Sequence, residues 1–168
     1  MEWKLPRVPP GLAVPSVEFD LTDDATWAVM WQQESWNETL LAFPGTIRSQ
    51  LRPDAEVSTW DVSGTWHAGF AGDVVSVETA WTKHRWGPSF GGPRFEEQLD
   101  DGHESDYCLN TLLLRSSGES CAVITLGGDS SDGQGTFTYL ADNVAVFFSL
   151  VAARAAGVLL PGDADAIP

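Results

Sequence analysis

The side chains that most often carry out catalysis are dispersed along this chain. The three histidines, His67, His84 and His103, fall in three different segments. A nucleophile must be activated by a base or by its surroundings, and neither Cys108 nor Cys121 has a neighbouring His or Lys that would activate its thiol. No Gly-x-Ser-x-Gly motif occurs. We therefore expect no catalytic residue and a protein that is not an enzyme.

Acidic side chains gather in one stretch of the second half of the chain. They are Glu96, Glu97, Asp100, Asp101, Glu104 and Asp106. Together with His103 these carboxylates could bind a metal, but adjacent carboxylates with a single His are far more often a solvated run of charge. We expect neither a metal nor a cofactor. Because the stretch has no evident role in a core, we take these six residues as the candidate partner-binding surface.

The Gly-rich segment 127–135 could suggest a calcium loop or a phosphate loop. With Asp129 as the first position of a calcium loop, Gly133 falls at the fifth position instead of the sixth, and Leu140 stands where the bidentate Glu is required. A phosphate loop needs a Lys followed by Ser or Thr, and this segment has none. We therefore expect a plain connection between two strands.

The net charge of this 168-residue chain is −15. Residues 1–94 hold 12 acidic and 7 basic side chains, a balance of −5, whereas residues 95–168 hold 12 acidic and 2 basic ones, a balance of −10. Such a surface repels nucleic acid and anionic membranes and speeds the encounter with a basic protein. We expect a basic protein partner, no nucleic acid and no membrane.

The first residues, the lengths of the apolar runs and the cysteines indicate the cellular compartment. The first residues lack the charged region and the apolar run of a signal peptide, and no run of about 18 apolar residues occurs. A hairpin centred on Ser117 and Gly118 would place Leu114 opposite Cys121, so that Cys108 and Cys121 do not pair. We expect two buried free thiols and a cytoplasmic protein.

The most regular pattern lies in residues 107–157. Three β-favouring runs, 107–114, 121–126 and 136–140, are bounded by Ser, Gly and Asp, which predicts an antiparallel meander. In the segment that follows, Val144, Phe147, Phe148 and Val151 recur at helical spacing, and Gly157 supplies a stop signal. This pattern predicts an apolar helix over residues 142–156.

The first half of the chain is less regular. Alternation over 17–21 predicts a strand with Val17 and Phe19 turned inward. Trp27, Met30 and Trp31 after a Thr cap predict a helix over 23–37. Residues 57–70 resemble a hairpin, and the clean alternation over 73–81 predicts a strand.

These elements add up to a single α+β domain. We expect a curved antiparallel sheet of about six strands packed against two main helices. Residues 1–16, with four prolines, should form an extended arm. The domain should occupy residues 17–160, and residues 161–168 should form a flexible tail.

The C-terminal segment Tyr139-Leu-Ala-Asp-Asn-Val-Ala-Val-Phe-Phe-Ser-Leu-Val151 resembles the SMI1/KNR4-like (SUKH) superfamily of bacterial immunity proteins. Members of that superfamily close with strands, a short polar-to-apolar junction and an amphipathic helix. The resemblance covers about a third of the chain. It implies an α+β domain with a strongly curved antiparallel sheet, no catalysis, and neutralisation of a toxin by covering its active surface.

The sequence thus favours a non-enzymatic cytosolic binding protein, an immunity protein that neutralises a basic nuclease or deaminase toxin through an acidic surface. The alternative is a pocket protein that binds or converts a small ligand in a Trp-rich cavity. A cavity lined by Trp60, Trp66 and Trp81 would favour the alternative, and a filled core with an open acidic face would favour the binding protein.

Overall fold

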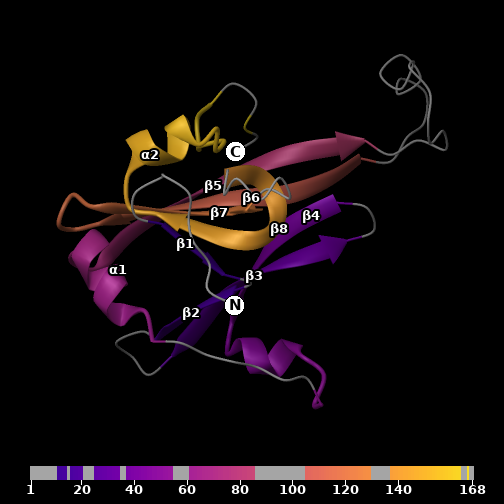
Figure 1. Cartoon of the computed structure of the whole chain (residues 1–168), viewed down its shortest axis with the longest axis horizontal. Helices are drawn as coiled ribbons and strands as arrows, with labels where there is room; N and C mark the ends of the chain where they lie inside the picture. The colour runs from indigo at the N-terminus through magenta and orange to yellow at the C-terminus, as the bar shows by residue number, and fades with distance from the viewer. Residues whose placement is uncertain are drawn as a thin grey trace.

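A computed structural model of the chain describes residues 11–14, 16–20, 25–34, 37–54, 61–85, 105–129, 137–163 and 166. These residues form strands and short helices whose order is shown in Figure 1. The elements are β1 (Gly11–Val14), β2 (Ser16–Asp20), β3 (Thr26–Glu34), β4 (Asn37–Pro44), η1 (Ile47–Gln50), α1 (Ser63–Gly69), β5 (Val74–Arg85), β6 (Ser105–Ser116), β7 (Cys121–Asp129), β8 (Phe137–Phe147) and α2 (Leu150–Ala155).

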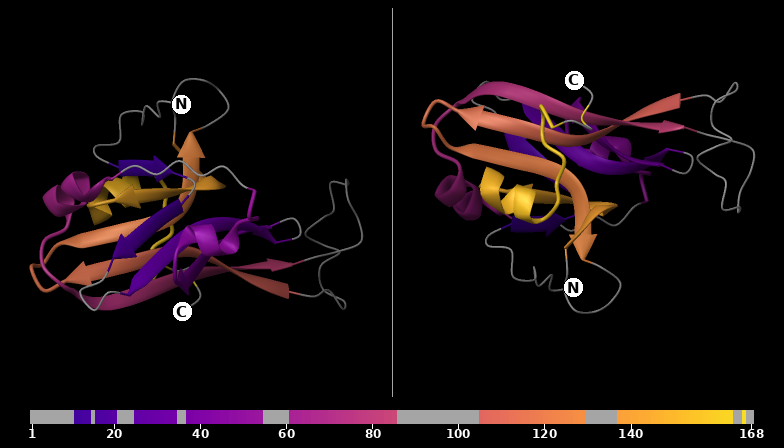
Figure 2. Two further views of the ribbon diagram at one scale, coloured as in Figure 1. Left: turned by 90° about the horizontal axis from the view of Figure 1, so that it is seen from below. Right: turned by 90° about the horizontal axis from the view of Figure 1, so that it is seen from above.

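The strands form two antiparallel sheets. Sheet A has five strands in the order β1-β8-β7-β6-β5, and sheet B has three in the order β2-β3-β4. The two sheets pack face to face, as the views along their edges show (Figure 2). The chain is therefore an α+β domain in which helices contribute little and antiparallel strands dominate.

The largest core lies between the sheets. Alternation along β7 shows how it is built, because Ala122, Ile124 and Leu126 face sheet B while Cys121 and Val123 face the opposite side. From sheet B, Val17, Val29 and Leu40 meet this face. Successive side chains of a strand point to opposite faces, so each central strand must carry apolar residues at both phases of the alternation.

Helices cover the two outer faces. The outer face of sheet A, with Val123, Ala145 and Phe147, packs against α2 and residues 158–160. The Ser149 hydroxyl oxygen accepts a hydrogen bond from the main-chain N–H of Ala152 at 3.3 Å and caps the start of α2. On sheet B, Ala28 and Phe43 pack against Ile47 of η1. The central part of each sheet is thus covered on both faces.

An aromatic cluster closes one end of the two-sheet core. Trp66 of α1 makes edge-to-face contacts with Phe19 of β2 and Phe148 after β8, with ring centroids 4.8 and 5.2 Å away. It also contacts Phe70 at 5.8 Å. Such arrangements stabilise beyond simple burial of area. The cluster therefore fixes α1 against both sheets.

The prediction of a helix over 23–37 is wrong, because Thr26–Glu34 form β3. This strand lies in the middle of sheet B and is covered on both faces, by the core between the sheets and by η1. Its apolar residues therefore occur at both phases. The spacing of Trp27, Met30 and Trp31 then imitates a helical face.

The predicted helix over 142–156 is confirmed only at its end, where α2 spans Leu150–Ala155. Residues 144–147 belong to β8, in which Val144 and Val146 face sheet B while Ala145 and Phe147 face α2. A continuous apolar run of this kind fits a buried strand or a buried helix equally well by periodicity.

Some of the remaining predictions are confirmed and others are wrong. The strands at 17–21 and 73–81 and the three-strand meander are confirmed by β2, β5, β6, β7 and β8. The hairpin expected in 57–70 is contradicted by α1, and the sheet of about six strands is in fact two sheets. Of the expected arm, residues 1–10 lie outside the described residues, and Gly11–Val14 pair with β8.

Candidate functional site

The acidic stretch connects the two ends of one hairpin. Arg85 at the end of β5 pairs with Ser105 at the start of β6, and His84 pairs with Asp106. The main chain of Asp106 is thus part of β6, while its side chain lies outside the described residues. The other candidate residues also lie outside the described residues. They are Glu96, Glu97, Asp100, Asp101 and Glu104. The structure thus gives the place where the stretch leaves the sheet and returns to it.

The strand ends that hold this stretch form an arm. The β6–β7 pairing runs only from Thr111 to Arg115, so residues 105–110 of β6 have β5 as their partner strand in sheet A. We call the paired segments 81–85 and 105–109 the β5–β6 arm. Figure 2 shows these ends extending past the other strands of sheet A. The acidic stretch is therefore carried at the end of a two-stranded ribbon.

A β-bulge forms the base of the arm. Ala80 pairs with Thr111 and Trp81 with Leu109, so Asn110 is the extra residue in β6. The bulge changes the phase of the strand, which explains why Leu109 and Leu112, three residues apart, both face the core between the sheets. Bulges bend and twist a strand. Here the bulge sets the direction in which the arm leaves the sheet.

Hydrogen bonds from both sheets fix this bulge. The Thr39 hydroxyl oxygen of β4 accepts from the main-chain N–H of Leu109 at 3.0 Å, and the same hydroxyl lies 3.4 Å from the Leu109 carbonyl oxygen. Within sheet A, the Asn110 side-chain amide donates to the Thr82 hydroxyl at 2.7 Å. The base of the arm is therefore joined to sheet B as well as to its own partner strand.

Asn110 belongs to a buried polar cluster. Thr125 donates its hydroxyl to the Asn110 carbonyl oxygen at 3.0 Å and lies 3.0 Å from the Thr111 hydroxyl. Asn110, Thr111 and Thr125 are each 0% exposed. The side-chain oxygen of Asn110 is buried and accepts no hydrogen bond. Buried polar groups whose hydrogen bonds are mostly satisfied favour one pairing of the strands over other pairings. The cluster therefore specifies the position of the bulge.

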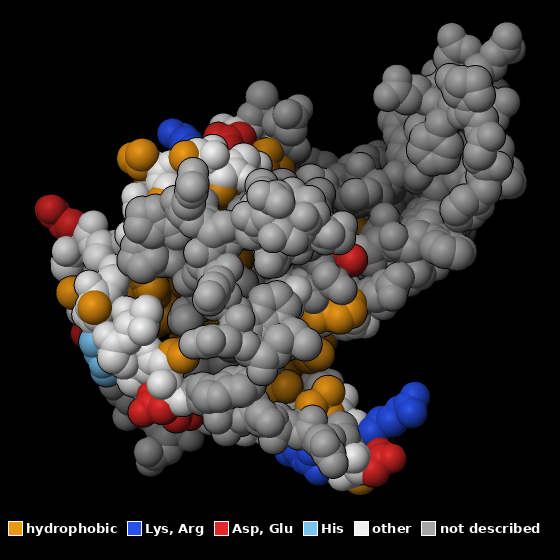
Figure 3. Space-filling view, in the orientation of Figure 1, with side chains coloured by type: hydrophobic (Ala, Val, Ile, Leu, Met, Phe, Trp, Pro, Cys, Tyr) orange, Lys and Arg blue, Asp and Glu red, His pale blue; other side chains and the backbone are white. Residues whose placement is uncertain are grey.

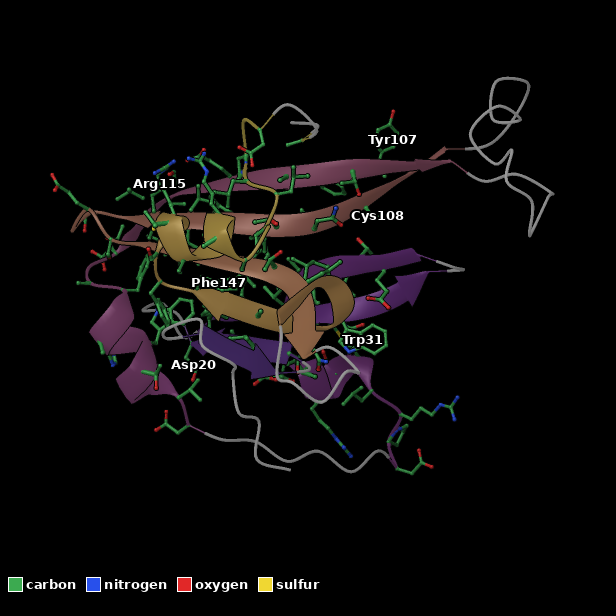
Figure 4. The ribbon with its side chains drawn as sticks, turned by 45° about the horizontal axis from the view of Figure 1, so that its top comes forward. Asp20, Trp31, Tyr107, Cys108, Arg115 and Phe147 are labelled. Atoms are coloured by element: carbon green, nitrogen blue, oxygen red, sulfur yellow. The ribbon has the colours of Figure 1, made fainter. Side chains whose placement is uncertain are left out.

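An aromatic side chain lies on the arm next to the acidic stretch. Tyr107 is 56% exposed. In Figure 4 its side chain points away from the ribbon, whereas Phe147 lies beneath α2. Tyr is enriched among the residues that contribute most to binding between proteins. Tyr107 is therefore an exposed aromatic residue of the arm that the sequence analysis did not select, because its apolar neighbours suggested only a strand.

The described charges elsewhere are scattered. On the face shown in Figure 3, acidic side chains of the described residues lie in several separate groups. Glu78 and Arg115 form an exposed ion pair between β5 and β6, and the Glu78 carboxylate raises the pKa of the Arg115 guanidinium. Hydrogen bonds from Ser63 lower the pKa of Asp61, which is exposed at the start of α1. These charges support local structure.

The residues considered for catalysis are not brought together in the part of the chain that the structure describes. His67 is exposed on α1, and the side chains of His84 and His103 lie outside that part. Cys108 and Cys121 are free, as predicted; Cys108 is buried and Cys121 is half-buried. The predicted register was off by one residue, since Arg115 lies opposite Cys121. Among described residues, no group of three or more His, Cys, Asp and Glu side chains could hold a metal.

The tryptophans of the alternative hypothesis have different surroundings. Trp66 is surrounded by aromatic rings, and Trp81 packs against the core between the sheets. Trp60 lies outside the described residues. Trp66 and Trp81 therefore contribute to the packing of the core.

No helix among the described residues is long and apolar enough to cross a membrane. Comparison of the chain with protein-family models, with curated proteins and with solved structures found no match.

Proposed function

We propose that this chain is a non-enzymatic, cytosolic binding protein that neutralises a basic protein, in the manner of a bacterial immunity protein acting on a nuclease or deaminase toxin. The observation that carries the proposal is the placement of the acidic stretch. Five of its six carboxylates lie in the sequence between Arg85 and Ser105, which pair at the end of the β5–β6 arm, and the chain has a net charge of −15.

The arm suits this role because its base is fixed while its end extends past the other strands of sheet A (Figure 2). Thr39 and Asn110 hold the base to both sheets. These bonds fix the point at which the acidic stretch leaves sheet A and returns to it. Negative charge concentrated there attracts a basic protein from solution and opposes acidic ones.

The resemblance of residues 139–151 to the SUKH superfamily supplies the class of partner. Immunity proteins of that kind act by covering the active surface of a toxin. Nuclease toxins bind a polyanion and for that reason present basic surfaces. An acidic arm is complementary to such a surface.

Recovery of the partner tests this function. A tagged form of the chain is expected to retain a basic protein from cells of its host, and an equimolar amount of the chain should inhibit the nuclease or deaminase activity of that protein. The variant Asp100→Asn, Asp101→Asn, Glu104→Gln should retain less of it, because three attractive charges are lost.

A matched variant controls for total charge. Asp20→Asn, Asp54→Asn and Asp61→Asn remove the same charge from three exposed residues outside the acidic stretch, and the new Asn side chains keep an oxygen that can accept the hydrogen bonds from Thr26 and Ser63. This variant should retain the partner as well as the unmodified chain does. Recovery of only acidic or neutral proteins, or full activity of the retained protein in the complex, would contradict the proposed function.

A further inference from the structure

Strand β5 has an open edge. It is the last strand of sheet A, with β6 on one side and no strand of either sheet on the other among the described residues. In an antiparallel pair, the main-chain N–H and C=O groups of alternate residues point away from the partner strand. Residues 76–80 therefore offer hydrogen-bonding groups along this edge, next to the arm.

Three valines in the first half of β5 are exposed. Val74, Val75 and Val77 are 48%, 64% and 55% exposed. Val77 pairs with Leu114 and shares the face that elsewhere packs on sheet B. The strand of sheet B beside it, β4, contacts β6, β7 and β8, so Val77 lies beyond the cover that β4 provides. A long edge with exposed apolar residues is a template for a further strand.

The described charged side chains at the start of this edge are mainly negative. Asp73 and Glu119 are exposed at the start of β5 and in the β6–β7 turn, and the Ser117 N–H donates to the Asp73 carbonyl oxygen at 2.9 Å, which brings the two segments together. Glu78 follows on the strand, where Arg115 is the one described basic side chain that pairs with it. An added strand that carries Lys or Arg would complement three carboxylates.

We infer that an extended segment of the basic partner adds to the open edge of β5 along residues 76–80, with apolar side chains over Val77 and basic ones near Asp73, Glu78 and Glu119. This inference rests on the proposed function and adds the mode of docking. Strand addition uses main-chain hydrogen bonds for affinity and alternate side chains for specificity. A second copy of the chain is a poorer occupant, because each copy has a net charge of −15.

Two synthetic peptides test the inference without the natural partner. The first is acetyl-Lys-Val-Lys-Val-Lys-Val-Lys-amide. The second has the same sequence with all six amides between residues N-methylated, so that it keeps the charge and loses these six main-chain N–H donors. Binding is measured by fluorescence anisotropy, and protection of the amides of β5 by hydrogen exchange.

We expect the first peptide to bind at least about tenfold more tightly than the second, because several main-chain hydrogen bonds of about 1 kcal/mol each are lost on methylation. The first peptide alone should slow exchange of amides in residues 76–80. Val77→Lys should weaken binding of the first peptide several-fold more than Val151→Lys, which makes the same charge change at an exposed site on α2.

Equal binding of the two peptides, with no protection of β5, would overturn strand addition while leaving the proposed attraction of a basic partner intact. Failure of both peptides to bind would also overturn the inference, and recovery of the partner would still decide the proposed function separately. Protection of β5 that rises with protein concentration in the absence of peptide would show that a second copy occupies the edge, which contradicts the inference.

Discussion

Phe147 is the largest side chain of the core beneath α2. It is 3% exposed and packs with Leu113, Val123 and Ala153. Phe147→Ala should lower the free energy of unfolding by about 3–5 kcal/mol, the usual cost of emptying a buried aromatic site. Denaturant titration measures this loss. Val151→Ala removes an exposed side chain from α2 and should change stability by less than about 0.5 kcal/mol; a similar loss for both variants would contradict the packing described.

Gly69 shows how closely the aromatic cluster is packed. A Cβ atom at this position would overlap the ring of Phe148, which is itself in contact with Trp66. Gly69→Ala should therefore cost about 1–3 kcal/mol, as overpacking usually does. Gly64→Ala is a matched control on the same helix, because a Cβ there meets nothing within 4 Å. If Gly69→Ala proves as stable as Gly64→Ala, the contact between α1 and Phe148 is looser than described.

The burial of single residues was easier to predict than their elements. Phe147 was expected on an apolar helix packed against the sheet, and it is buried in β8. The hydrophobicity of a side chain decides whether it is buried, and the neighbouring strands decide the conformation of the main chain around it. The role of Asn110 could not be predicted, because a polar residue in an apolar strand shows its partners only after Thr82 and Thr125 are brought beside it.

Among the elements, the β-bulge at Asn110 is the one that positions the candidate site. Thr39→Val keeps the shape of the side chain and removes both contacts with the Leu109 main chain. This change should cost about 1–3 kcal/mol, because a partly buried N–H is left without its acceptor. Thr39→Ser retains the hydroxyl and should recover most of the loss. Equal stability of the two variants in thermal or denaturant unfolding would show that the bond to Thr39 does not hold the bulge.

Elements whose two faces differ in polarity were predicted best. Strand β5, at the edge of sheet A, shows alternation of apolar Val77 with polar Ser76 and Glu78. Strands β3 and β8 are covered on both faces, so their alternation is hidden and helices were predicted in their place. Helix α1 is short and depends on Trp66 reaching the aromatic cluster, a tertiary contact that no local pattern indicates.

The position of the acidic stretch in the molecule depends on the pairing and the order of the strands. The sequence predicted an α+β domain and located the acidic stretch, but not its place at the end of an arm, since that place depends on the pairing of Arg85 with Ser105 and on where the β6–β7 pairing stops. The open edge of β5 also depends on the order of the strands. Strand order depends on contacts distant in sequence, which periodicity does not encode.

The central claim is that the acidic stretch attracts a basic partner, and the rate of association with the recovered partner tests it most directly. Rates should be measured by stopped flow at several salt concentrations for the unmodified chain, for Asp100→Asn, Asp101→Asn, Glu104→Gln, and for the control Asp20→Asn, Asp54→Asn, Asp61→Asn. Charges at the rim of an interface act mainly on encounter, and salt screens them. We predict slower association and a weaker salt dependence for the first variant, with the melting temperature unchanged and the control close to the unmodified chain. Identical rates and salt dependence for all three proteins would contradict the claim.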